Sequence, residues 1–327
     1  MCYDYFMIFK LTKEDFEQLD KLITVYDENC NENDYLNNEI IRRIPNLNEV
    51  NNIKIDCLDL NNYCNDIYYK NIHPVEIKDG SYLIKYQSYQ PGECFLYDDI
   101  EVKTNKYYQV KNKVGYFTKP YKFLTIQKNN TTWMSVIPHE INTMNACSNI
   151  KNKTLYVFGL GLGYYPYINA SKVNEIIIVE KDKKIIELFN KYIFPLFNDK
   201  QKYKIINDDA FNYVNKINED DSIFVDLWHN PSDALMPYIK LTKVFKKHND
   251  VHYWINKSIL QYIRNLLITL IYEERYQVGV DYTKYKSDED KVINKFHILL
   301  KDKIFNSFQE IMNLLTDEEI TKLVINL

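Results

Sequence analysis

The chain has 327 residues, of which 46% are hydrophobic, and a formal net charge of -4 at pH 7. That length and hydrophobic content suffice for two or three domains with a sizeable core. The slightly acidic balance argues against nucleic acid and anionic membranes as partners. No apolar run is long enough to span a membrane, and the first residues lack the basic segment of a secretory signal, so a cytoplasmic protein is expected.

The six cysteines form no Cys-x-x-Cys pair and do not cluster with histidines. Neither a metal site nor a disulfide framework is therefore expected, and the cysteines are interpreted as buried or inactive thiols.

Residues 1–74 are predicted to form an N-terminal helical region. Thr12 and Asp15 resemble a capping box, and the apolar residues that follow at helical spacing predict a helix over 13–28. A second helix is predicted to carry Leu36, Ile40, Ile41 and Ile44. Residues 47–74 are rich in Asn and Asp, and no structure is assigned to them.

Residues 75–148 are predicted to form a small antiparallel β domain and a linker. Apolar and polar residues alternate over 75–137, with a turn at 90–93. The strand candidates begin at Tyr82, Cys94, Ile100, Val114 and Tyr121.

Residues 149–257 carry the most informative pattern. The apolar run 155–158 leads into Gly159, Gly161 and Gly163, which predicts a strand, a tight turn and a helix start. A dinucleotide fingerprint would need its third glycine one residue later, where this chain has Tyr164. The observed spacing is commoner in enzymes that bind S-adenosylmethionine (SAM), and a turn with a purely geometric role is the alternative.

Three further strands are predicted downstream, and each ends in an acidic residue: Glu180, the pair Asp208 and Asp209, and Asp226. A fifth strand is predicted at 251–255. Strands that alternate with helices form parallel sheets with right-handed crossovers. Because such sheets bind ligands at their carboxyl edge, the acids predict a nucleoside crevice with Glu180 on the ribose hydroxyls.

These motifs together resemble a class I SAM-dependent methyltransferase domain, with its Rossmann-like sheet, and more narrowly its spermidine-synthase-like branch. The segment 136–141, just upstream, is similar to the Tyr-His-Glu-Met segment of that branch. The resemblance covers about residues 133–256 and implies a preceding β-rich domain. It implies that the three glycines face the methionine part of SAM and that Glu180 binds the ribose. It also implies that Asp209 and Ala210 contact the adenine, that Asp226 lies at the reacting centre, and that His139 lies near the ligand.

The chain also departs from the branch. Met134 and Ser135 replace an acidic pair that a polyamine cation would need, and Pro138 replaces the tyrosine. These departures favour methyl transfer to an unidentified acceptor, with a small molecule preferred over protein or RNA. The alternatives are aminopropyl transfer from decarboxylated SAM and a module that binds SAM or a nucleoside without turnover.

The expected chemistry needs few groups, because the sulfonium is already activated and mainly requires an oriented nucleophile. Asp226 or His229 is predicted to orient or deprotonate the acceptor. His139 and Glu140 are candidate lid residues, with a helix start as the alternative. Trp133 and Trp228 either wall the acceptor pocket or pack in the core. Asp226, His229 and Asp233 flank one loop, but no metal site is expected.

Residues 258–327 are predicted to form a C-terminal helical extension. A broad apolar stripe on one long helix begins at Ile259 and ends at Ile271, a second helix carries Val292 to Leu300, and Thr316 with Glu319 caps a last one. The two final antiparallel strands of a methyltransferase are not evident. The extension is expected to cover the sheet edge or to form a homodimer interface.

Overall fold

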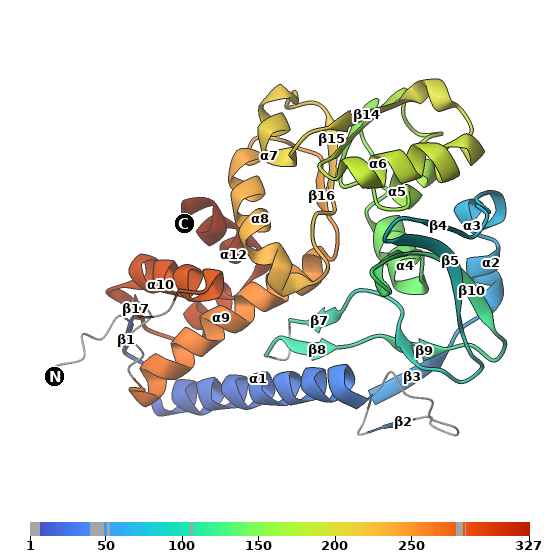
Figure 1. The fold of residues 1–327 in the computed structure, drawn as a ribbon. Helices are drawn as coiled ribbons and strands as arrows, with labels where there is room; N and C mark the ends of the chain where they lie inside the picture. Colours follow the sequence, from blue (N-terminus) through green and yellow to red (C-terminus); the bar gives the residue numbers. More distant parts are fainter. Residues whose placement is uncertain (1–6, 40–48, 51–52, 105–106, 279–283, 285) are drawn as a thin grey trace.

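The structure of the protein, a computed structural model, describes residues 7–39, 49–50, 53–104, 107–278, 284 and 286–327. It is a mixed α/β fold built on one parallel sheet, with further sheets and helices before it and a helical extension after it (Figure 1). None of the described helices is long and apolar enough to cross a membrane.

The parallel sheet has five strands in the order β14-β13-β12-β15-β16, and all four pairings are parallel. Its strands are the five that the sequence predicts: β12 (Thr154–Phe158), β13 (Glu175–Glu180), β14 (Tyr203–Asn207), β15 (Ser222–Val225) and β16 (Val251–Tyr253). The apolar runs of β13 and β15 are buried because helices cover both faces of a parallel sheet. The Rossmann-like fold class is thereby confirmed.

Short helices connect these strands and bring the carboxyl ends to one edge. They are α5 (Tyr164–Asn169), α6 (Lys183–Leu188), α7 (Ala210–Tyr213) and α8 (Pro231–Val244). One π-helical turn (Phe189–Ile193) extends α6, and a 3-10 turn at Phe194–Leu196 ends it at Pro195. A helix cannot easily continue through proline.

The β-rich region differs from the single antiparallel sheet that alternation predicts. Four strands do form an antiparallel sheet in the order β11-β10-β5-β4, namely β4 (Ile77–Asp79), β5 (Tyr82–Tyr89), β10 (Tyr121–Lys128) and β11 (Thr131–Ser135). The others form a hairpin, β7 (Glu101–Lys103) with β8 (Gln109–Lys111), and a second sheet of β2 (Glu49–Val50), β3 (Ile53–Cys57), β9 (Val114–Tyr116) and β6 (Phe95–Leu96). In that sheet β3 and β9 run parallel, and β3 comes from the stretch to which no structure was assigned.

The N-terminal helix is longer than predicted and packs against the C-terminal extension. Helix α1 (Lys13–Glu39) extends past the predicted end at 28 and includes Leu36, whereas Ile40, Ile41 and Ile44 lie outside the described residues. The predicted cap is confirmed, because Thr12 and Asp15 exchange hydrogen bonds between side chain and backbone. Two further helices, α2 (Leu60–Cys64) and α3 (Ile67–Asn71), precede the antiparallel sheet.

The C-terminal extension contains α9 (Asn256–Tyr276), α10 (Asp288–Leu300), α11 (Phe308–Leu314) and α12 (Asp317–Asn326). The predicted stripe on α9 is buried within the chain, where α9 contacts α1, α8, α10 and α12. A parallel pair, β1 (Met7–Phe9) with β17 (Lys303–Phe305), joins the two ends of the chain beside α1 (Figure 1). The stripe therefore belongs to the core, and the homodimer stays a prediction.

A buried arginine holds α9 to α12. Arg264 is 1% exposed, donates to the Leu315 carbonyl at 2.7 Å, pairs with Asp317 and lies 4.4 Å from the centre of the Tyr108 ring. We expect Arg264→Met to keep the stem packing but to lower the free energy of unfolding by about 1–3 kcal/mol, because the carbonyl loses its donor. Urea unfolding measures this. The exposed pair of Glu318 with Lys322 provides the control, since Glu318→Gln should leave the free energy of unfolding nearly unchanged.

Candidate functional site

A cavity of about 560 Å³ lies at the carboxyl edge of the parallel sheet. This volume falls in the range of small-molecule sites, roughly 300–1,000 Å³. The cavity brings together seven of the nine predicted site residues, which are Gly159, Gly161, Glu180, Asp209, Ala210, Asp226 and His229. Residues that are up to 70 positions apart in the sequence thus converge, because parallel strands end at the same edge.

The three glycines have different roles in the turn after β12. All three have positive φ, at 97°, 55° and 75° for Gly159, Gly161 and Gly163. A Cβ on Gly159 would lie 2.0 Å from the Asp226 carbonyl oxygen, so this glycine allows β12 and β15 to approach closely. A Cβ on Gly161 would have no atom within 4 Å, so the turn faces open space at this residue.

Gly163 does not line the cavity. A Cβ there would lie 2.5 Å from the Phe189 ring, and the residue is the left-handed N-cap of α5. The structure therefore gives Gly163 a packing role behind the turn, which is the geometric alternative considered for this motif.

Glu180 is positioned by the glycine turn itself. Its Oε2 accepts a hydrogen bond from the Leu160 N–H at 3.1 Å, and its Oε1 accepts one from the Asp182 N–H at 2.8 Å. The carboxylate thus stands beside Gly161 at the end of β13, with lone pairs left for two hydroxyl donors. Nearby, Asp209 caps α7 by accepting from the Phe211 N–H at 2.8 Å and places Ala210 in the cavity wall.

Asp226 and Glu140 give the cavity an acidic interior. Burial, and secondly the charge of Glu180, raise the pKa of Asp226 to about 7. Burial, and secondly the charge of Asp226, raise the pKa of Glu140 well above its ordinary value. Neither side chain has a hydrogen-bond or ion-pair partner among the described residues. Such carboxylates favour a cationic ligand, because a cation would stabilise their charged forms.

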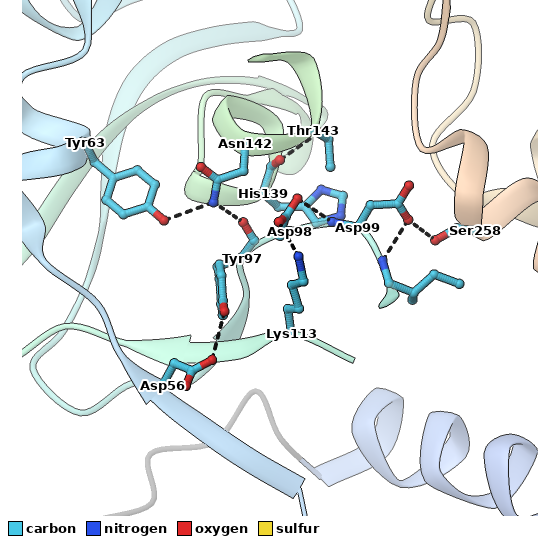
Figure 2. Close-up of polar contacts among 11 residues, drawn as sticks. Asp56, Tyr63, Tyr97, Asp98, Asp99, Lys113, His139, Asn142, Thr143 and Ser258 are labelled. Atoms are coloured by element: carbon cyan, nitrogen blue, oxygen red, sulfur yellow. Dashed lines mark hydrogen bonds and ion pairs between the residues drawn. The ribbon is translucent and has the colours of Figure 1, made fainter. Parts of the chain in front are cut away.

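His139 points away from this cavity. It lies on α4 (Pro138–Ala146), whose first turn it shares with Glu140, but its ring meets Trp254 edge-to-face at 5.9 Å. Figure 2 shows the ring beside the turn formed by Asp98 and Asp99. Burial lowers the pKa of His139, and these two aspartates oppose the shift. The structure thus brings Glu140, rather than His139, into the cavity.

His229 lies at the exposed mouth of the cavity, next to Trp133 of β11. The two rings are edge-to-face at 5.2 Å, and Lys128 Nζ lies 4.7 Å from the centre of the Trp133 ring. Trp254 also lines the cavity and was not predicted. Its place directly after β16, at the ligand-binding edge, was the signal available in the sequence. No group of three metal-ligating side chains occurs among the described residues.

The central segment matches a family model. Residues 144–266 match the spermine/spermidine synthase domain. This segment contains all five strands of the parallel sheet and the glycine turn, and it covers less than half of the chain. No curated protein sequence matches the chain at a significant level.

Several solved structures are similar to the chain. A spermidine synthase from Thermotoga maritima is 15% identical over 45% of this chain and 58% of its own, with a TM-score of 0.33. A spermidine synthase in complex with the transition state analogue AdoDATO is 16% identical over 49% and 61%, with a TM-score of 0.33. MNMC2 from Aquifex aeolicus is 18% identical over 46% and 60%, with a TM-score of 0.29.

The chain thus spans about three-fifths of the length of these proteins. The family match covers the central segment alone, and the five strands of the parallel sheet lie within that segment. Residues 144–266 thus resemble the spermine/spermidine synthase domain and contain a Rossmann-like parallel sheet.

Proposed function

We propose that this chain transfers an alkyl group from a SAM-type sulfonium to an amine acceptor. The observation that carries the proposal is the convergence of the glycine turn, Glu180 and Asp226 on one cavity in a spermidine-synthase-like domain. Glu180 would hold the ribose hydroxyls, Asp209 and Ala210 would meet the adenine, and Gly161 would leave space for the methionine part.

The step requires one base. A protonated amine gives its proton to the Asp226 carboxylate, and the nitrogen lone pair then attacks the carbon bound to sulfur. The carbon–sulfur bond breaks, and its electron pair stays on sulfur as a neutral thioether. A carboxyl with a pKa of about 7 suits this proton transfer, because half of it is ionised at neutral pH while it remains a competent base.

Methyl transfer from SAM is the first candidate. Aminopropyl transfer from decarboxylated SAM is the second, and the unpartnered carboxyls of Glu140 and Asp226 favour it. The carboxylate of SAM would experience repulsion in an acidic cavity, whereas the decarboxylated donor has no such group.

The co-product distinguishes these candidates without knowledge of the acceptor. The full chain is incubated with each donor and a mixture of mono-, di- and polyamines, and the thioether is identified by mass spectrometry. S-adenosylhomocysteine indicates methyl transfer, and 5′-methylthioadenosine indicates aminopropyl transfer. Formation of neither thioether above the level of heat-denatured protein would contradict the proposed function.

The pH dependence follows from the same group. Asp226 acts as a base only when ionised, so we expect kcat/KM to rise with pH and to level off above about 7. Initial rates between about pH 5 and pH 9, at constant ionic strength, measure this profile. A rate that stays flat across the neutral range would show that no group with this pKa controls the step.

A further inference from the structure

All three tryptophans of the chain line the proposed active-site cavity. They come from separate elements: Trp133 from β11, Trp228 from the loop after β15, and Trp254 from the residue that follows β16. Tryptophan supplies a large planar surface at a low cost in conformational entropy. The few tryptophans of this chain therefore all lie around one cavity.

Two of the indoles are fixed in place. Trp228 and Trp254 are each 5% exposed, and their Nε1 groups donate to the Trp254 carbonyl at 3.3 Å and to Thr143 Oγ1 at 2.8 Å. The next residue, Ile255, has a φ of 50°, which is a strained conformation for a β-branched side chain. The backbone is thus strained at Ile255, the residue next to Trp254.

The third indole forms the outer wall. Trp133 is 37% exposed and stands on the β10–β11 hairpin, between His229 and Lys128. Its exposed position means that it adds little to the core. A ring held at the mouth of a cavity by two side-chain contacts is instead placed to cover a bound molecule.

The carboxyls of Glu140 and Asp226 lie in the same cavity as the indoles. They reach it from α4 and from the end of β15, and neither has a hydrogen-bond or ion-pair partner among the described residues. A bound ammonium group would supply the missing partner for both. An aromatic wall and a carboxylate pair together select a ligand that has a ring and a cation.

We propose that the acceptor is an arylalkylamine, a planar ring that carries an ammonium group on a short chain. This inference rests on the proposed function and names its substrate class. The ring stacks against the indoles, and the ammonium group meets Glu140 and Asp226. A flexible aliphatic polyamine would leave the aromatic walls without a matching surface.

Binding of three probes by the full chain tests the substrate class. The probes are 2-phenylethylamine, 1,4-diaminobutane and 2-phenylethanol, which carry ring and charge, charge alone, and ring alone. Tryptophan fluorescence reports the titrations, with and without saturating S-adenosylhomocysteine or 5′-methylthioadenosine. We expect 2-phenylethylamine to bind at least about tenfold more tightly than either other probe, since one aromatic contact contributes about 0.5–1.5 kcal/mol and several are available.

Variants at the mouth test the role of the ring. Trp133→Leu should weaken 2-phenylethylamine binding about tenfold and leave 1,4-diaminobutane binding unchanged, and Trp133→Phe should restore most of the loss. Tyr272, which is 39% exposed and outside the cavity lining, gives the control Tyr272→Leu. Calorimetry measures the Trp133 variants, because one fluorophore is removed.

The outcomes separate this inference from the proposed function. Equal or tighter binding of 1,4-diaminobutane, or unchanged 2-phenylethylamine binding in Trp133→Leu, would overturn the arylalkylamine assignment even if S-adenosylhomocysteine binds. If neither S-adenosylhomocysteine nor 5′-methylthioadenosine binds, the proposed function fails. The ranking of the three probes on the unliganded chain then still decides whether the cavity selects an arylalkylamine.

Discussion

Replacement of Asp226 by asparagine is expected to lower the rate of transfer by about 10²–10⁴-fold and to leave donor binding intact. The amide cannot accept the acceptor's proton, but its shape and its place at the end of β15 are unchanged. Single-turnover rates and donor titration measure the two effects. A variant that keeps more than about a tenth of the rate would contradict the role of Asp226 as the base.

The same variant is expected to be more stable than the parent at neutral pH. Because the pKa of Asp226 is raised from 3.8 to about 7, the folded chain binds the proton more tightly than the unfolded chain. The free energy of unfolding therefore falls as pH rises from about 4 to about 7, and it stays at the lower value above that range. A shift of this size corresponds to at most about 4 kcal/mol, and access of water to the cavity reduces it to about 1–3 kcal/mol.

Urea unfolding at two pH values tests this gain. Asp226→Asn should stabilise the chain by about 1–3 kcal/mol at pH 8 and have little effect near pH 4, where the aspartate is already protonated. The exposed Asp220→Asn serves as the matched control and should change stability by under about 0.5 kcal/mol. Equal stability of Asp226→Asn and the parent at pH 8 would show that Asp226 is ionised at little cost.

Gly159→Ala is expected to lower the free energy of unfolding by about 2–5 kcal/mol. The new Cβ would lie 2.0 Å from the Asp226 carbonyl oxygen, and the backbone there cannot move away freely, because the Asp226 N–H donates to the Phe158 carbonyl at 2.9 Å. The positive φ of 97° adds strain for any residue with a side chain.

Gly161→Ala separates binding from stability. No atom lies within 4 Å of its added Cβ, so only the positive φ opposes it, at about 1 kcal/mol. The methyl group would, however, enter the space proposed for the donor. We therefore expect the free energy of unfolding, measured in urea, to fall mainly in Gly159→Ala. The affinity for the donor, measured by titration, should fall in both variants. If Gly159→Ala is as stable as the parent, the close approach of β12 and β15 described here is wrong.

The sequence predicted the parallel sheet because apolar runs, three of them closed by an acid, are typical of strands that are buried on both faces and end at a ligand-binding edge. It did not predict which strands pair in the β-rich region, since alternation identifies a strand but not its neighbours. The pairing of β1 with β17 joins three-residue segments almost 300 positions apart, and so short a strand has no periodicity to detect.

The site was predicted as far as strand ends define it. Glu180 and Asp226 follow from the edge at which parallel strands end. The sequence does not decide whether His139 or Glu140 faces the cavity. Neighbouring residues on a helix point about 100° apart, and only the packing of α4 decides which one does. The cluster of tryptophans likewise depends on tertiary structure, because β15 and β16 lie in the parallel sheet and β11 reaches the cavity from the antiparallel sheet.

The central claim is that Glu180 and the glycine turn hold a SAM-type donor. Calorimetric titration of the full chain with SAM, S-adenosylhomocysteine, decarboxylated SAM and NAD tests it most directly. Glu180→Gln alters the proposed ribose contact, and Glu175→Gln, at the exposed other end of β13, is the matched control. We expect micromolar binding of SAM or decarboxylated SAM, little binding of NAD, a loss of about tenfold or more in Glu180→Gln, and no change in Glu175→Gln. Absence of binding by all four ligands, or equal binding by both variants, would contradict the donor site.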